Sequence, residues 1–131
     1  GSLVLHNLFG RFPDLRVMSI ENGSAWVPYL LRVMDKAAQT GARGRWLGGP
    51  VTDRPSEIFK QHVSVAPFDD DDARALVDLI GAERVLLGSD YPHPEGYPEP
   101  RDFFSGVAFS DDERRKIEQT NAAHLLRLAV A

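Results

Sequence analysis

Apolar positions along the chain follow two patterns, short runs typical of strands and stripes at helical spacing. The runs at 16–20, 63–66 and 85–88 predict three short strands. The stripes predict helices before, between and after the strands, over 3–12, 24–40, 56–61, 69–80, 101–105, from Ser110 and over 122–130. Strands that alternate with helices indicate an α/β fold in which parallel strands are joined by right-handed crossovers and covered by outer helices.

Local signals place the ends of several helices. Pro13 should end the first helix, because proline disfavours helix in the residue before it. Ser24 is expected to cap the second, whose apolar stripe would be Trp26, Leu30, Val33 and Ala37. The stripe of the helix after Asp69–Asp72 would be Ala73, Leu76, Val77 and Ile80, with Gly81 closing it. Ser110 followed by Glu113 fits a capping box.

Composition narrows the class of protein. The chain has 131 residues, a formal net charge of −4, 43% hydrophobic residues and no cysteine. This balance argues against disorder and against electrostatic binding of nucleic acid. No apolar run approaches the roughly 20 residues needed to span a bilayer, and no signal peptide is visible, so we expect a cytoplasmic chain without membrane or nucleic-acid partners. Residues 1–2 resemble a tag remnant, and the whole of 1–131 is interpreted as a single segment.

Candidate chemistry lies on the loops that follow the strands, where parallel α/β folds carry their sites. Asp90 follows the third strand directly, and His93 comes three residues later between prolines. A carboxylate beside a histidine suits a divalent metal or a general base. Glu21 ends the first strand and should open to the same face as Asp90. Arg45, in a long loop rich in glycine and proline, is a candidate for binding an anionic substrate.

Each of these residues also has a structural interpretation. An aspartate after a strand is often a turn or cap residue, and a strand-end glutamate such as Glu21 is often an ion-pair partner. Trp26 falls on an apolar stripe that favours the core over a substrate platform. Exposed loop arginines such as Arg43 and Arg45 are usually solvated. The acidic run Asp69–Asp72 is expected to be a solvated cap at a helix N-terminus.

Several spaced segments together resemble one known family. The segment 85–96, VLLGSDYPHPEG, resembles the last-strand motif of metal-dependent amidohydrolases of the second type, which include aminocarboxymuconate-semialdehyde decarboxylase. Four further segments resemble the same family in the same order, namely 10–17, 21–34, 65–81 and 121–126. The resemblance covers nearly the whole chain. It implies the C-terminal part of a (β/α)8 TIM barrel, about strands six to eight.

The resemblance also implies a function and a set of site residues. Asp90 matches the strand-eight aspartate that binds the metal or handles the proton of its water, and Glu21 stands where many members have histidine. The implied activity is that of a metal-dependent hydrolase of C–N or C–O bonds, or a carboxy-lyase, acting on a small organic substrate. Zn²⁺ or a similar divalent ion is the implied cofactor in the longer parent protein. Asp90 and Glu21 are the expected catalytic residues, Asp90 is the expected metal ligand, and substrate contacts are expected from His93, Trp26 and Arg45.

A rival hypothesis is a non-catalytic chain that self-associates. Three strands alone would expose apolar edges and part of a barrel interior, and such surfaces drive association. We therefore expect a homo-oligomer under either hypothesis. We also expect the 131-residue chain on its own to bind no catalytic metal tightly and to show no turnover, because zinc catalysis usually needs three protein ligands.

Overall fold

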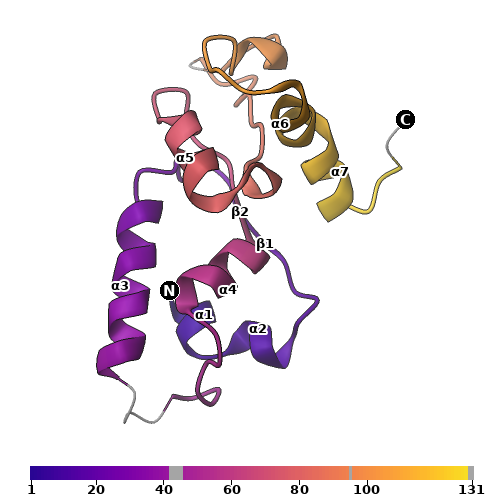
Figure 1. Cartoon of the computed structure of the whole chain (residues 1–131). Helices are drawn as coiled ribbons and strands as arrows, with labels where there is room; N and C mark the ends of the chain where they lie inside the picture. Colours follow the sequence, from indigo (N-terminus) through magenta and orange to yellow (C-terminus); the bar gives the residue numbers. More distant parts are fainter. Residues whose placement is uncertain (42–45, 95, 130–131) are drawn as a thin grey trace. The chain divides into compact units, whose positions relative to one another are not determined.

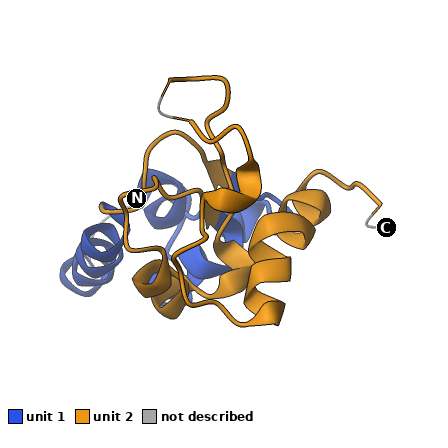
Figure 2. Cartoon of the chain, turned by 90° about the horizontal axis from the view of Figure 1, so that it is seen from above, with its two compact units in different colours: residues 1–17, 26–63 blue, residues 18–25, 64–131 orange. Residues whose placement is uncertain are grey.

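The computed structural model describes residues 1–41, 46–94 and 96–129. The chain divides into two compact units (Figure 2). Unit 1 holds residues 1–17 and 26–63, and unit 2 holds residues 18–25 and 64–131. Within the described ranges, no helix is both long and apolar enough to cross a membrane.

Unit 1 begins with two short helices where the sequence predicts one helix over 3–12. These are α1 (Ser2–Leu5) and α2 (Leu8–Arg11), shown in indigo in Figure 1. The break falls at Asn7, whose backbone is left-handed with φ of 54°. Asparagine tolerates this conformation, and the Asn7 side chain donates a hydrogen bond to the carbonyl of Gly48 at 3.2 Å. A contact made 41 residues away in the sequence therefore divides the predicted helix.

The long helix α3 (Val27–Thr40) begins later than predicted and buries a different face. Ser24 does not cap it, and Pro28 lies in its first turn. Its buried residues are Val27, Leu31, Met34 and Asp35, so the predicted stripe of Trp26, Leu30, Val33 and Ala37 is wrong. The true stripe lies one position further along and includes a charged residue, which periodicity of apolar side chains does not reveal.

Asp35 is buried because helix α4 (Pro55–His62) supplies partners for its carboxylate. The Ser56 amide and hydroxyl each donate a hydrogen bond to it at 2.9 Å, and the Arg54 guanidinium forms an ion pair with it. Burial alone would raise the pKa of Asp35, but these hydrogen bonds and the Arg54 charge outweigh it and hold the pKa below its usual value. The start of α4 is thus fixed to α3.

The sheet contains two of the three predicted strands. β1 (Val17–Ser19) pairs with β2 (Val63–Val65), and the carbonyl of Ser19 accepts a hydrogen bond from the amide of Ala66 at 3.0 Å. The predicted third strand at 85–88 is reduced to one parallel bridge between Val65 and Val85. The neighbour order therefore agrees with the prediction, but the third segment is not a strand.

Hydrogen bonds explain why the third segment leaves the sheet. The Leu86 amide still donates to the Val65 carbonyl at 3.0 Å, but the next amide, of Leu87, donates to the Ile117 carbonyl at 3.2 Å. Ile117 lies in η3 (Lys116–Thr120), a π-helical turn between α6 (Asp111–Arg115) and α7 (Asn121–Leu125). The C-terminal helical segment thus replaces a neighbouring strand as the partner of the chain that leads to Asp90.

Asn121 fixes the same segment through its side chain. Its amide nitrogen donates to the carbonyls of Ala82 and Val85 at 2.7 and 2.8 Å, and the residue is 9% exposed. Ala82 belongs to a short 3-10 turn, η1 (Ala82–Arg84), which precedes the bridge. Buried amides pair in this way because an unsatisfied polar group inside a protein is costly.

Two sequence predictions for the helices of unit 2 are confirmed. Helix α5 (Ala73–Ile80) buries the predicted stripe of Ala73, Leu76, Val77 and Ile80, and Asp72 caps it by accepting from the Ala75 amide. Ser110 and Glu113 form the predicted capping box at the start of α6. The predicted helices at 101–105 and 122–130 are shorter, as the 3-10 turn η2 (Pro100–Asp102) and as α7; residue 130 lies outside the described part of the chain.

Candidate functional site

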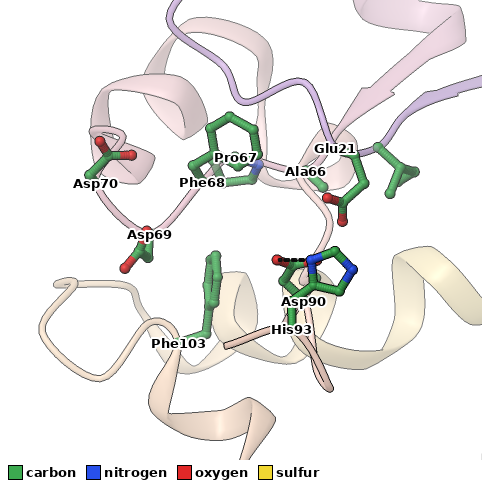
Figure 3. A pocket seen from close by; sticks show the side chains of 11 residues that line it. Glu21, Ala66, Pro67, Phe68, Asp69, Asp70, Asp90, His93 and Phe103 are labelled. Atoms are coloured by element: carbon green, nitrogen blue, oxygen red, sulfur yellow. Dashed lines mark ion pairs between the residues drawn. The ribbon is translucent and has the colours of Figure 1, made fainter. Parts of the chain in front are cut away.

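Unit 2 contains a pocket with a volume of about 500 Å³ beside the ends of the sheet (Figure 3). This volume is in the usual range for small-molecule sites. Apolar side chains and glycine form part of its wall, namely Ile20, Ala66, Pro67, Phe68, Gly88 and Phe103. The remaining lining residues are ionisable, namely Glu21, Asp69, Asp70, Asp90 and His93. Three of the residues predicted from the sequence, Glu21, Asp90 and His93, therefore line one pocket.

Both strand-end carboxylates have an unusual backbone conformation. Glu21 has φ of 59° and Asp90 has φ of 55°, in the left-handed region. Residues other than glycine adopt it rarely, and such outliers gather at functional sites. In both cases the chain turns sharply after a strand or bridge, and the side chain reaches the pocket. In Figure 3 the carboxylate of Glu21 points toward the pair formed by Asp90 and His93.

Asp90 and His93 form the one ion-pair contact drawn in Figure 3. Nδ1 of His93 lies 3.8 Å from Oδ2 of Asp90, and the two side chains are 65% and 29% exposed. A backbone turn holds them together, since the His93 amide donates to the Asp90 carbonyl at 2.9 Å. The loop is then closed by the Tyr97 amide, which donates to the Ser89 carbonyl at 2.7 Å.

Gly96 completes this loop because its backbone packs against Asp90. A Cβ atom at position 96 would lie 2.5 Å from the carbonyl carbon of Asp90, so no side chain fits there without moving the loop. A side chain at position 96 would therefore disturb the backbone at Asp90.

Asp71 and Asp69 connect the loops of the pocket, a role that the sequence analysis missed. Oδ2 of Asp71 accepts from the Ser24 amide at 2.6 Å and from the Phe68 amide at 2.9 Å. It thereby joins the turn after β1 to the turn after β2. The Tyr97 hydroxyl donates to Asp69 at 3.3 Å, and the negative charge of Asp69 raises the pKa of Tyr97. Only the capping role of Asp72 follows from the local sequence.

The sequence predicts two further substrate contacts, Trp26 and Arg45. Trp26 belongs to unit 1, where its ring packs edge-on against Phe59 with centroids 6.1 Å apart. Arg45 lies outside the described residues, as does Arg43. Their predicted roles remain predictions.

The profile of the amidohydrolase family matches residues 2–128. The chain belongs to the amidohydrolase family. It is 27% identical over 129 residues to a gamma-resorcylate decarboxylase from Rhodococcus jostii, an alignment that covers 96% of this chain and 38% of the relative.

Solved structures of amidohydrolases show the same fold. An amidohydrolase from Mycobacterium avium subsp. paratuberculosis superposes with a TM-score of 0.84 at 37% identity, over 95% of this chain and 31% of that one. A 5-carboxyvanillate decarboxylase from Novosphingobium aromaticivorans, complexed with manganese and 4-hydroxy-3-methoxy-5-nitrobenzoic acid, superposes with a TM-score of 0.76 at 25% identity. That superposition covers 97% of this chain and 37% of the decarboxylase.

The chain thus spans little more than a third of the length of the curated amidohydrolase relatives that it matches. The likeness agrees with a partial α/β barrel, as the sequence resemblance implies. The numbering of its strands as six to eight remains a prediction.

The pocket contains side chains of the kinds that bind divalent metals in proteins. Glu21 and Asp90 offer carboxylate oxygens of the kind that Mn²⁺ and similar ions prefer, and His93 offers a nitrogen. Within the described ranges, however, no group of three or more His, Cys, Asp or Glu residues is close enough to hold a metal ion. These residues therefore do not form a complete metal site by themselves.

Proposed function

We propose that this chain forms part of the active site of an amidohydrolase-type decarboxylase that acts on a small organic acid. The observation that carries the proposal is the meeting of Glu21, Asp90 and His93 in one pocket beside the sheet. The relatives named as decarboxylases support decarboxylation over hydrolysis. Nothing in the structure or the comparisons favours the rival hypothesis of a non-catalytic, self-associating chain.

Charge supports a divalent metal in the complete site. The pocket is lined by four carboxylates and one histidine, so an acidic substrate entering it alone would be repelled. A divalent cation would offset this charge, and the Novosphingobium decarboxylase holds manganese. Glu21 would supply an oxygen ligand, Asp90 would supply one whenever it does not hold the proton of the reaction, and the other ligands would come from outside the described residues. The ion would stabilise negative charge on the substrate.

The residues of this chain would supply the proton that the substrate takes up. In decarboxylation the bond between the substrate carbon and its carboxylate breaks, CO₂ leaves, and the electron pair left on carbon takes up one proton. Asp90 would donate that proton, and His93, whose Nδ1 lies 3.8 Å from Oδ2 of Asp90, would return one to it from solvent. Glu21, after the end of β1, would orient the substrate or complete the ligand set.

Asp90→Asn tests this role in the protein as its gene encodes it, whether that is this chain or a longer one. Gamma-resorcylate and 5-carboxyvanillate, named for the relatives, are offered with Mn²⁺ or Zn²⁺, and CO₂ release is measured. Loss of a general acid should lower kcat by about 10²- to 10⁴-fold. Asp14→Asn, an exposed change in unit 1, is the matched control and should keep full turnover. Unaltered turnover in Asp90→Asn would refute the role of Asp90.

A further inference from the structure

We propose that Asp71 is a positioning residue that keeps the carboxylate of Glu21 in the pocket by holding the turn after β1, residues 20–24. The inference deepens the proposed function and rests on it, because that function gives the Glu21 carboxylate its role. Glu21 lines the pocket, whereas Asp71 does not. Asp71 instead binds the backbone of the turn that carries Glu21. It would therefore act on the reaction through another residue.

The turn after β1 needs a restraint because its backbone is strained. Glu21 and Gly23 have φ of 59° and 57°, so two of three consecutive residues are left-handed. Glycine adopts this conformation freely, but glutamate does so at a cost and stays there only where the surrounding structure fixes it. Inside the turn, the Asn22 side-chain amide donates to the Ile20 carbonyl at 2.7 Å, in an exposed position. This bond joins neighbours in the sequence, so it does not attach the turn to the rest of the pocket.

Asp71 supplies that attachment. The sheet pairing continues as far as the hydrogen bond from the Ala66 amide to the Ser19 carbonyl, at 3.0 Å. Beyond it, Oδ2 of Asp71 accepts from the Ser24 amide at 2.6 Å and from the Phe68 amide at 2.9 Å. Amide hydrogen bonds to an ionised carboxylate are stronger than those between neutral groups. One oxygen atom thus ties the turn after β1 to the turn after β2.

Close packing around Gly23 strengthens this tie. A Cβ atom at position 23 would lie 2.7 Å from the Phe68 ring and 3.0 Å from Oδ2 of Asp71, so the turn approaches both groups at a distance that only glycine permits. Asp71 is itself held, because its amide donates to the Phe68 carbonyl at 3.3 Å and its carbonyl accepts from the Ala73 amide at 2.9 Å. Ala73 is the first residue of helix α5 and is buried, so the carboxylate is fixed to a helix that begins in the core.

The other three aspartates of the acidic run make different contacts. Asp69 accepts from a tyrosine hydroxyl, Asp70 lines the pocket, and Asp72 caps α5. Asp71 is therefore the member of the run whose loss should free the turn, and with it the left-handed backbone at Glu21.

The first test asks whether Asp71 holds the turn, and it needs no substrate. Asp71→Ala removes the acceptor, whereas Asp71→Asn removes the charge and keeps an oxygen that can accept from both amides. In the protein as its gene encodes it, hydrogen exchange at the Ser24 and Phe68 amides should be about 5-fold faster in Asp71→Ala, the effect of one lost hydrogen bond. Asp71→Asn should lie close to the unaltered protein. Asp78→Ala, which replaces an aspartate of α5 that pairs with Arg74, is the matched control and should leave both rates unchanged.

The second test asks whether Asp71 acts through Glu21. A crystal structure of Asp71→Ala should show the Glu21 carboxylate displaced from the pocket. With Mn²⁺ and whichever of gamma-resorcylate and 5-carboxyvanillate releases CO₂, Asp71→Ala should lower kcat/KM by roughly 10- to 100-fold, as expected when a reacting group is misplaced. In a Glu21→Gln background the same change should alter kcat/KM by about 2-fold or less, because the group that it displaces is already lost. A merely structural role of Asp71 would give equal losses in both backgrounds.

Gly23→Ala reaches the same turn by an independent route if Asp71→Ala does not fold. Its Cβ atom would press on the Phe68 ring and the Asp71 carboxylate, so it should also speed exchange at the Ser24 amide and displace Glu21. Unchanged exchange, or a Glu21 carboxylate that stays in the pocket, in the variant that folds would overturn the proposal, as would equal losses of kcat/KM in both backgrounds. If the protein releases no CO₂, the proposed function fails on its own, and the exchange rates and the crystal structure still decide the role of Asp71.

Discussion

Asn121→Leu should destabilise the protein, because the Asn121 amide is the buried link between the C-terminal helical segment and the chain that leads to Asp90. Leucine has the same branching at Cγ and is somewhat larger, and the change removes both hydrogen bonds, to Ala82 at 2.7 Å and Val85 at 2.8 Å. Each such bond contributes about 1 kcal/mol, and two buried carbonyls would lose a partner, so the free energy of unfolding should fall by about 2–3 kcal/mol. For a chain of this size that corresponds to a fall in Tm of roughly 10 °C.

Urea unfolding at pH 7, compared with Gln119→Leu, measures this effect. Gln119 is an exposed amide in the same helical segment, and its replacement should change stability by about 0.5 kcal/mol or less. Asn121→Asp should cost more than Asn121→Leu at this pH, because it sets a negative charge against two carbonyl oxygens. Hydrogen exchange should also accelerate at the Leu86 and Leu87 amides, which bond Val65 and Ile117. Equal stability of Asn121→Leu and Gln119→Leu would refute the reasoning.

Two further predictions concern buried or paired carboxylates. Asp35→Asn should lower stability by about 2 kcal/mol at pH 7, since it sets an amide donor against Ser56, while the exposed change Asp53→Asn should have little effect. Because the pKa of Asp35 is lowered in the fold, the contribution of its carboxylate to stability is complete above the unfolded pKa and is lost as the pH falls. The unfolding curves of Asp35→Asn and the unaltered protein should therefore converge in acid. A difference that persists there contradicts this account. Hydrogen bonds from Arg74 and from the Ser110 amide lower the pKa of Glu113 from 4.5 to about 2. Glu113→Gln should therefore be less stable than the unaltered protein at pH 7 and should match it as the pH falls through this interval. An equal Tm at pH 7 would argue against a stabilising Arg74–Glu113 ion pair.

Local signals predicted those elements whose causes are local. The capping box at Ser110 and the stripe of α5 depend on residues within a few positions of one another, and both agree with the structure. Ser24 has equally good local chemistry for a cap, but its amide is bonded to Asp71, 47 residues away. The third strand failed for the same reason, because the partner of Leu87 is a carbonyl of the C-terminal helical segment.

The meeting of Glu21 and Asp90 in one pocket could be predicted from the sequence, whereas their roles stay predictions. Glu21 and Asp90 meet because strand ends of a parallel sheet lie at one edge. The links made by Asp69 and Asp71 were missed, since an acidic run at a helix start is explained equally well by the helix dipole. Phe68 and Phe103 gave no signal either, because isolated phenylalanines in loops have no periodicity to interpret.

The left-handed backbone at positions 21 and 90 also limits which substitutions a selection experiment can recover. Glycine, asparagine and aspartate enter this conformation at low cost, whereas valine, isoleucine and threonine are strongly disfavoured there. A library randomised at either position should therefore be depleted of β-branched residues even when it is screened for folding alone. Enrichment of aspartate at position 90 would indicate a chemical role only if aspartate is also enriched over asparagine, which adopts the same left-handed conformation equally well. Position 21 is the more informative of the two, because the long glutamate side chain does not favour this backbone conformation. If a library screened for activity retains glutamate there in preference to glycine, the reason must be the function of its carboxylate.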